Sequence, residues 1–183
     1  MRYLIVCGGK IDKEFGLNEI KTDGIDAIIA ADSGMDFLYE NGVTPDIIVG
    51  DFDSTTTNAL EYFERKGQTE IRRLNPVKDD TDTEYAIRLA ISEGARSIVV
   101  LGATGSRIDH VLGNISLLGI GLESGTDIRI IDTNNRIRMA DKPVTIEKSA
   151  QYGRFISLIA LTDDNEVSLK GFKYPVTDYS FDR

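Results

Sequence analysis

The sequence predicts an α/β fold, in which an N-terminal domain with a parallel sheet is followed by a C-terminal antiparallel β-sandwich. Three observations predict it. Strand-like and helix-like patterns alternate over residues 1–126, as in parallel sheets covered by helices. The strand-like runs are nearly continuous in Ile, Val, Leu and Ala, which is typical of strands buried on both faces. After residue 126 the helical patterns stop and short β-rich runs follow one another.

The expected elements of the first domain alternate along the chain. Strand-like apolar runs lie at residues 3–7, 26–31, 46–49, 70–74 and 97–101. Helix-like stretches lie at residues 35–41, 57–66, 81–93 and 107–122. The helix at 81–93 has the strongest signals, because Thr81 and Glu84 form a capping-box pattern and Gly94 ends the run.

The second domain is predicted from a change of pattern. Its β-rich runs lie at residues 127–131, 136–140, 144–148, 154–161 and 166–169, with turn residues between them. We therefore expect two domains, residues 1–126 and residues 127–183. A sandwich with so few strands would expose its edges, so a second subunit could cover them.

The cysteine content and the hydrophobic runs indicate a cellular location. The chain of 183 residues has a single cysteine, Cys7, inside the apolar run 3–7, which predicts a buried structural thiol. The run after Met1 is too short for a secretory signal, and no stretch approaches the ~20 apolar residues of a membrane span. We expect a cytoplasmic protein that does not enter a membrane.

The net charge of −9 bears on the ligand class. Residues 1–126 carry 12 Lys and Arg against 21 Asp and Glu, whereas the remainder is balanced. Nucleic-acid binding relies on Lys and Arg that neutralise phosphates, so no nucleic-acid partner is expected. A phosphate substrate should arrive with a metal ion, and a cationic small molecule would be attracted.

Aspartates follow two neighbouring strand-like runs. Asp32 comes after the run 26–31, and Asp51 and Asp53 come after the run 46–49. The carboxyl ends of parallel strands share one edge of a sheet, so these side chains should converge there. Gathered carboxylates repel one another unless a cation holds them, and Mg²⁺ prefers oxygen ligands. Solvated turns with capping aspartates are the alternative.

A third acidic segment lies at the start of the helix predicted at 81–93. Asp80 precedes the helix, and Asp82 lies just inside it, where the helix dipole favours a carboxylate. Lys78, set among these acids, is a candidate ligand of a phosphate group. A purely structural role for the carboxylates and a solvated lysine are the alternatives.

A glycine-containing turn follows the strand-like run 97–101. Small residues at 102–105, including Thr104 and Gly105, would let backbone N–H groups approach a phosphate at the start of the next helix. The turn lacks the lysine and hydroxyl residue of a Walker A loop. Arg107 could bind phosphate through two hydrogen bonds. His110, the only histidine, is either structural or part of the site.

Taken together, these segments resemble thiamine pyrophosphokinase of the bacterial type. The resembling segments, in the order of the family, are residues 31–34, 45–54, 78–82 and 102–114. The resemblance covers the chain from its first strand to about Tyr174. It implies an α/β domain and a C-terminal β-sandwich, as the patterns already predict.

The resemblance implies an enzyme that transfers diphosphate from ATP to the hydroxyl of thiamine and releases AMP. It implies that Asp51, Asp53 and Asp82 hold Mg²⁺ and that Asp32 lies nearby. Lys78 and Arg107 would contact phosphate oxygens, and Asp109 would lie near the thiamine hydroxyl or the metal. The expected catalytic residues are therefore Asp51, Asp53, Asp82 and Asp109, and the expected nucleotide-binding residues are Asp32, Lys78, Asp80, Thr104, Gly105, Arg107 and His110.

The resemblance also implies a homodimer whose active site lies between the subunits. Residues 1–126 would bind the nucleotide and magnesium, and residues 127–183 would bind thiamine. Family members usually continue past the segment 171–175 with further strands, whereas this chain stops at Arg183. We therefore expect the thiamine-binding domain to be incomplete at its C-terminus.

Two other functions fit parts of the sequence. Asp51 and Asp53 followed by Thr55 match the nucleophile motif of haloacid-dehalogenase-like phosphohydrolases, although that motif normally follows the first strand of its sheet. The short C-terminus is compatible with a non-catalytic protein that binds a nucleotide or thiamine. The residue that accepts the proton of the attacking hydroxyl, Asp109 or a metal ligand, stays open.

Overall fold

The computed structural model describes residues 1–52, 58–75, 80–105 and 107–181. The chain divides into two compact units, Met1–Tyr152 and Gly153–Arg183. In the described residues, no helix is both long enough and apolar enough to cross a membrane.

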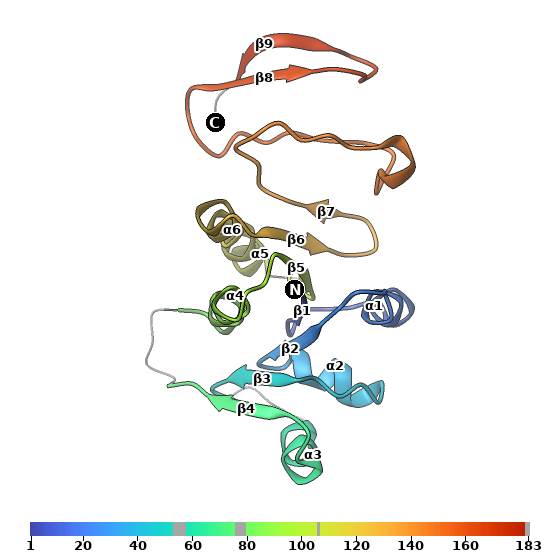
Figure 1. The fold of residues 1–183 in the computed structure, drawn as a ribbon, viewed down its shortest axis with the longest axis vertical. Coiled ribbons are helices and arrows are strands. Elements are labelled where there is room, and N and C mark those ends of the chain that lie inside the picture. The colour runs from blue at the N-terminus through green and yellow to red at the C-terminus, as the bar shows by residue number, and fades with distance from the viewer. Residues whose placement is uncertain (53–57, 76–79, 106, 182–183) are drawn as a thin grey trace. The chain divides into compact units, whose positions relative to one another are not determined.

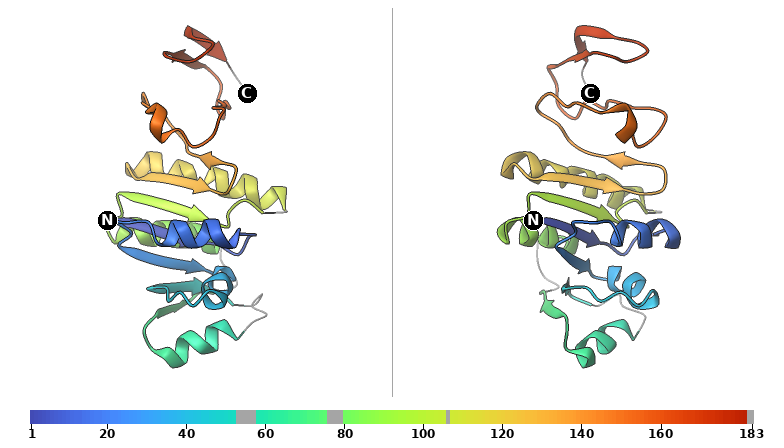
Figure 2. Two further views of the ribbon diagram at one scale, coloured as in Figure 1. Left: turned by 90° about the vertical axis from the view of Figure 1, so that its right-hand side faces the viewer. Right: turned by 45° about the vertical axis from the view of Figure 1, so that its right-hand side comes forward.

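The first unit is built on one sheet with the strand order β4-β3-β2-β1-β5-β6-β7 (Figure 1). Its strands are β1 (Arg2–Val6), β2 (Ala27–Ala31), β3 (Ile47–Gly50), β4 (Glu70–Arg73), β5 (Ser97–Leu101), β6 (Asp127–Ile131) and β7 (Arg136–Ile137). The first six pair in parallel, and β7 runs antiparallel to β6. Figure 2 shows the parallel strands pointing the same way, so the loops that follow them meet at one edge.

Helices cover both faces of this sheet (Figure 1). They are α1 (Lys13–Ile20), α2 (Gly34–Glu40), α3 (Ala59–Lys66), α4 (Asp82–Ser92), α5 (Ile108–Ser116) and α6 (Leu118–Ser124). The first three lie on one face and the last three on the other. This is the doubly covered parallel sheet that the alternating pattern predicts.

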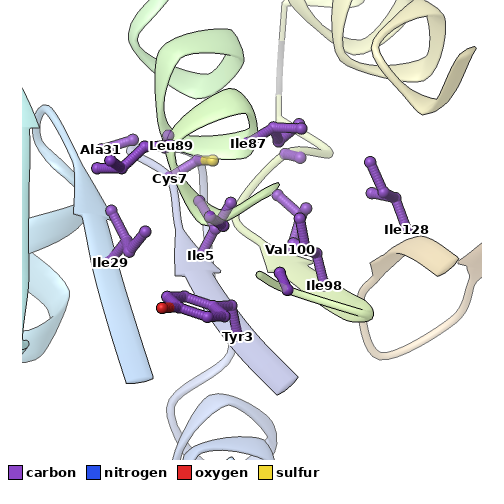
Figure 3. Close-up of a cluster of buried hydrophobic side chains, with 14 of the residues drawn as sticks. Tyr3, Ile5, Cys7, Ile29, Ala31, Ile87, Leu89, Ile98, Val100 and Ile128 are labelled. Carbon is purple, nitrogen blue, oxygen red and sulfur yellow. The ribbon is translucent and has the colours of Figure 1, made fainter. Parts of the chain in front are cut away.

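The core follows the alternation of strand side chains. On β1 and directly after it, alternate side chains point to the face under α4; these are Tyr3, Ile5 and Cys7 (Figure 3). Ile87 and Ala90 of α4 are buried on the same face. The intervening strand residues Leu4 and Val6 point to the other face, with Met35, Leu38 and Phe63 of α2 and α3. Both faces are apolar because both are covered by helices. Burial of Cys7 confirms the expected structural thiol.

The helix α4 begins as the sequence predicts. The side chain of its N-cap residue, Thr81, accepts a hydrogen bond from the backbone N–H of Glu84 at 3.2 Å. Gly94 follows the helix with φ of 87°, a conformation that glycine adopts without strain. The cap fixes the start of α4 and therefore the position of Asp82.

The assignment of residues 127–131 to the antiparallel unit is wrong. This run forms β6, which pairs in parallel with β5, Ile98 opposite Ile128. A short apolar run carries no mark of its pairing direction, and the run joins the parallel sheet because Ile128, Ile130 and Ile131 are buried against it.

Several element boundaries also differ from expectation. The helix expected at 107–122 is two helices that meet at Leu117, where the Ser116 hydroxyl donates to the carbonyl of Gly113. The helix α1 was not expected. Its N-cap residue, Asp12, accepts a hydrogen bond from the N–H of Phe15 at 2.9 Å.

The strands expected at 144–148 and 154–161 do not form, because these runs have no ladder partner in the described part of the chain. Residues Lys148–Ala150 instead form a short 3₁₀ turn. The second unit contains an antiparallel pair, β8 (Asn165–Leu169) and β9 (Val176–Phe181), with an irregularity between Val167 and Leu169. This pair confirms the antiparallel character of the C-terminal region, whereas the sandwich is only partly confirmed.

Candidate functional site

Three carboxylates meet at the carboxyl edge of the parallel sheet. Asp32 follows β2, Asp51 follows β3, and Asp82 is the first residue of α4. One oxygen from each side chain lies within 4.8 Å of the other two, and all three residues are half-buried. The sequence prediction that Asp32, Asp51 and Asp82 converge is therefore met by the structure. We call these three residues the carboxylate cluster.

The backbone at Asp32 is shaped to bring its side chain to the edge. Asp32 has φ of 48°, a left-handed conformation that is costly for a residue other than glycine. Its N–H donates to the carbonyl of Val49 at 2.8 Å, which ties the end of β2 to β3. A Cβ at Gly50 would lie 3.1 Å from the Cα of Asp32, so only glycine fits there without displacement. The fold thus keeps Asp32 and Asp51 close.

Residues around Asp51 are held by packing. Phe52 also has a left-handed backbone, with φ of 64°, and its side chain is buried. The guanidinium of Arg73 lies 5.3 Å from the centre of the Phe52 ring. Asp53, the expected second carboxylate of this turn, lies outside the described residues.

The third carboxylate is placed by a capped helix. Asp82 stands at the N-terminus of α4, where the partial positive charge of the helix end favours its ionised form. Asp80, two residues earlier, is exposed, and it does not belong to the group of carboxylates whose oxygens lie within 4.8 Å of one another. Lys78, the expected phosphate ligand of this segment, lies outside the described residues.

Glycines lie in the two loops that follow β1 and β5, the neighbouring strands at which the strand order changes direction. The N–H of Gly9 donates to the carbonyl of Gly102 at 2.9 Å, and a Cβ on Gly9 would lie only 2.2 Å from that oxygen. Gly102 has φ of 69°, and its own Cβ would lie 2.3 Å from the carbonyl of Cys7. Ligands of open α/β sheets bind at such a switch point. The sequence prediction missed Gly8 and Gly9, although two glycines directly after the first strand were a usable signal.

The glycine loop, residues 102–105, carries two expected phosphate contacts. Asn114 of α5 donates through Nδ2 to the carbonyl of Ala103 at 2.9 Å. The Thr104 side chain is half-buried. Gly105 is exposed beside Gly9. The loop is therefore anchored by Gly9, which follows β1, and by Asn114 of α5.

Arg107 and Asp109 form an ion pair at the start of α5. Arg107 donates from Nε and Nη2 to the two carboxylate oxygens of Asp109, at 3.2 and 2.6 Å. The Arg107 hydrogen bond lowers the pKa of Asp109 to about 2. Both side chains are about two-thirds exposed, and His110 beside them is exposed as well. Asp109 is not a member of the carboxylate cluster.

The Cys7 thiol lies next to this edge and is inert. Burial raises its pKa to about 11, and its Sγ lies 3.4 Å from Oγ1 of Thr83 in α4. A thiol with such a pKa stays protonated at neutral pH, so Cys7 does not serve as a nucleophile.

An acidic cluster at the carboxyl edge of an open parallel sheet, with a glycine loop at its switch point, defines an α/β protein of the phosphate-handling type. Comparison with known proteins gives a narrower assignment. Residues 21–130 match the thiamin pyrophosphokinase catalytic domain, and residues 143–183 match the thiamin pyrophosphokinase vitamin B1 binding domain. The chain belongs to the thiamine pyrophosphokinase family.

Individual relatives agree with this family. Thiamine pyrophosphokinase of Bacillus subtilis is 37% identical over 152 residues, which are 82% of this chain and 70% of the relative. The crystal structure of thiamine pyrophosphokinase from Bacillus subtilis matches with a TM-score of 0.84 at 34% identity, over 98% of this chain and 83% of that one. That from Geobacillus thermodenitrificans matches with a TM-score of 0.79 at 26% identity, over 100% and 84%.

Proposed function

We propose that this chain is a thiamine diphosphokinase, which transfers diphosphate from ATP to the hydroxyl of thiamine and releases AMP. The observation that carries the proposal is the carboxylate cluster at the carboxyl edge of the sheet, in a chain of this family. Such a cluster is useful for a substrate that carries several negative charges and brings a cation with it.

The carboxylate cluster fits a magnesium ion. Mg²⁺ binds oxygens at about 2.1 Å, so two ligands of one ion lie up to about 4.2 Å apart. Oxygens of Asp32, Asp51 and Asp82 lie within 4.8 Å of one another, close to that span. We propose that these residues, together with Asp53, hold Mg²⁺. Bound there, the ion would neutralise charge on the phosphate oxygens.

The proposed reaction is an in-line displacement at the β-phosphorus. The thiamine hydroxyl oxygen forms a bond to that phosphorus, and the bond from phosphorus to the oxygen bridging to the α-phosphate breaks. The electron pair leaves with AMP, and the hydroxyl proton goes to a carboxylate. Phosphoryl transfer depends on positioning and charge neutralisation, which the residues at this edge can supply.

Cationic and backbone groups are proposed to hold the polyphosphate. The glycine loop offers backbone N–H groups at the start of α5, where an anion is favoured. Arg107 can bind two phosphate oxygens at once, and Lys78 would add a point charge. Asp80 and His110 flank the same loops and are proposed to contact the nucleotide.

Asp109 is the proposed proton acceptor when it is released from Arg107. With a pKa of about 2, the paired carboxylate is a weak base. An exposed ion pair contributes little to stability because water screens it, so a polyphosphate can take Arg107 from Asp109 at little cost. The carboxylate then becomes more basic, at the moment when the phosphate is in place.

The second unit is proposed to bind thiamine, as the vitamin B1 binding model that matches residues 143–183 suggests. Thiamine is a cation, and the acidic charge of the chain would attract it. A homodimer with its active site between subunits is likewise proposed. Exposed apolar side chains such as Phe155, Ile159 and Tyr174 support a partner surface. A cytoplasmic location is proposed on the basis of the single, unpaired Cys7.

Product analysis tests the proposed function. The protein is incubated with ATP, Mg²⁺ and thiamine, and nucleotides and thiamine species are separated by chromatography. We expect AMP and thiamine diphosphate in equal amounts. ADP with thiamine monophosphate would mean transfer of one phosphoryl group. Inorganic phosphate alone would indicate a phosphohydrolase, and the absence of any product would indicate a binding protein.

A further inference from the structure

Phe52, the residue after Asp51, has a backbone conformation that its surroundings must enforce. Its φ of 64° is left-handed, which costs energy for a residue other than glycine. Its ring is buried, in the same cluster as Met35, Leu38 and Phe63. A strained conformation persists only where contacts hold it, so the contacts of this ring bear on the shape of the turn that carries Asp51.

One side of this turn is fixed by the sheet. Gly50, the residue before Asp51, ends β3, and its carbonyl accepts a hydrogen bond from the N–H of Leu74 at 2.9 Å. A Cβ on Gly50 would lie 3.1 Å from Cε1 of the Phe52 ring. The ring therefore folds back against Gly50, and Asp51 is the residue between the two.

A second contact of the ring comes from the neighbouring strand. Arg73 of β4 is opposite Gly50 in the register of the two strands. Its guanidinium carbon lies 5.3 Å from the centre of the Phe52 ring. At this distance a cation is attracted to the face of an aromatic ring. The ring thus contacts both members of one residue pair of the sheet.

The guanidinium of Arg73 is itself held by an ion pair. Its Nη2 donates to Oε1 of Glu64 in α3 at 2.5 Å. Both side chains are about half exposed, so water screens the pair and it contributes little stability by itself. Its effect is one of placement, because a guanidinium tied to Glu64 stays near the ring of Phe52 instead of moving freely in water.

The position of the Asp51 carboxylate depends on this arrangement. Asp51 supplies one of the three carboxylate oxygens that lie within 4.8 Å of one another. If the ring of Phe52 moved away from Gly50, the backbone of the turn would move with it and carry Asp51 out of the carboxylate cluster. Because like charges repel, the carboxylate cluster needs such a restraint before a cation binds.

We propose that Arg73 is a positioning residue for Asp51, which it keeps in the carboxylate cluster by holding the ring of Phe52. The proposal rests on the proposed function, in which this cluster binds Mg²⁺. Charge and placement act in opposite directions here. A positive charge nearby weakens the binding of a cation, whereas correct placement of Asp51 strengthens it.

The sign of the effect on metal affinity tests the proposal. The probe is Mn²⁺, which takes oxygen ligands as Mg²⁺ does, and electron paramagnetic resonance measures the free ion. Arg73→Gln removes the charge and the contact with the ring, whereas Arg73→Lys keeps the charge. Arg65→Gln is the control, because Arg65 is also an exposed arginine that pairs with a glutamate, Glu61.

Arg73→Gln should bind Mn²⁺ about fivefold more weakly than the parent chain, as expected for a lost cation–π contact. Arg73→Lys should lie between the two, because an ammonium is attracted to the ring but lacks the planar group. Arg65→Gln should bind Mn²⁺ at least as tightly as the parent chain. Melting temperatures are measured in parallel, and a lower melting temperature of Arg73→Gln with unchanged Mn²⁺ affinity would mean a merely structural role.

A double-mutant cycle traces the effect to the ring. In a Phe52→Leu background, Arg73→Gln should no longer weaken Mn²⁺ binding, because the ring through which Arg73 acts is gone. Equal losses in both backgrounds would show that Arg73 acts without the ring, and they would overturn the proposal. If Phe52→Leu does not fold, the sign of the Arg73→Gln effect decides alone.

Two further outcomes overturn the proposal. One is that Arg73→Gln binds Mn²⁺ as tightly as the parent chain or more tightly. The other is a parent chain that binds no Mn²⁺, since the carboxylate cluster then holds no metal for Arg73 to serve. A parent chain that binds Mn²⁺ but makes no thiamine diphosphate would refute the proposed function alone, and the Mn²⁺ affinities would still decide the role of Arg73.

Discussion

The helices α4 and α5 start at the same edge of the sheet and each brings a carboxylate of the proposed site, yet they are held very differently. The N-cap residue of α4 is Thr81, whose side chain caps the helix, and Ala86, Ile87, Leu89 and Ala90 are buried. The N-cap residue of α5 is Arg107, which makes no side-chain capping hydrogen bond, and no residue of this helix is buried. Ile108 and Leu112 of α5 are exposed.

This difference separates a fixed part of the site from an adaptable part. The position of Asp82 follows from the cap and the core under α4, before any ligand binds. The position of Asp109 follows from one exposed ion pair with Arg107, which a phosphate can replace. The metal position is therefore expected to be preorganised, and the α5 side of the site is expected to respond to the substrate.

The largest effect is expected from the fixed part. Asp82→Asn should lower kcat/KM by about a thousandfold or more, because a ligand of the proposed Mg²⁺ is lost. Without Mg²⁺ its melting temperature should equal or exceed that of the parent chain, since one of three neighbouring like charges is gone. Steady-state kinetics measure kcat/KM, and thermal unfolding with and without Mg²⁺ measures the melting temperature. Asp23→Asn, in an exposed turn, is the control. Activity within tenfold of the parent chain would remove Asp82 from the metal site.

A smaller loss is expected from the adaptable part. Arg107→Ala should lower kcat/KM for ATP by about a hundredfold, because a guanidinium that can bind two phosphate oxygens is lost. Arg107→Lys should recover only part of this loss, since an ammonium lacks the planar pair of donors. Steady-state kinetics with varied ATP measure it. Arg88→Ala removes an exposed arginine that pairs with Glu84 on α4, and it should leave activity unchanged.

The ion pair itself can be followed by the titration of Asp109. Its carboxyl should titrate near pH 2 in the parent chain and closer to the ordinary value of about 3.9 in Arg107→Ala. Because the folded pKa is lowered, the pair stabilises the protein above the ordinary pKa, and this stabilisation is lost as the pH falls through about 2. Carboxyl NMR measures the midpoint. An unchanged midpoint in Arg107→Ala would mean that another group holds Asp109.

The smallest effect is expected from the cap of α4. Thr81→Ala should lower the free energy of unfolding by about 1 kcal/mol, the usual value of an N-cap hydrogen bond. Thr81→Ser keeps the hydroxyl and should restore most of it. Denaturant unfolding measures the difference. A loss in Thr81→Ala without recovery in Thr81→Ser would show that the methyl group of Thr81, and not the cap, stabilises the helix.

Much of the site could be predicted from the sequence because it depends on a simple rule of parallel sheets. Asp32 and Asp51 each follow a buried strand, so the rule places them at one edge, and the capping box fixes Asp82 at the start of its helix. The rule does not predict how far apart two side chains at that edge lie. It could not show that Asp109 would pair with Arg107 outside the carboxylate cluster.

Other features could not be predicted because their signal lies in partners far along the chain. The parallel pairing of β6 depends on β5, and the run itself is only a short apolar segment. Residues 154–161 have a β-rich composition, yet a strand also needs a neighbour to receive its backbone hydrogen bonds. The Tyr152 hydroxyl donates to the carbonyl of Asp132, and no local pattern in either segment indicates this contact.

The buried thiol of Cys7 can report how often the first unit opens. It is the only cysteine of the chain, and it lies in the core under α4, as Figure 3 shows. A thiol reagent can reach Cys7 only when the first unit opens. Opening of the second unit alone leaves the thiol covered by the core of the first unit. The rate of Cys7 modification, measured with increasing ATP and Mg²⁺, would therefore report how strongly a ligand closes the first unit, without any introduced label.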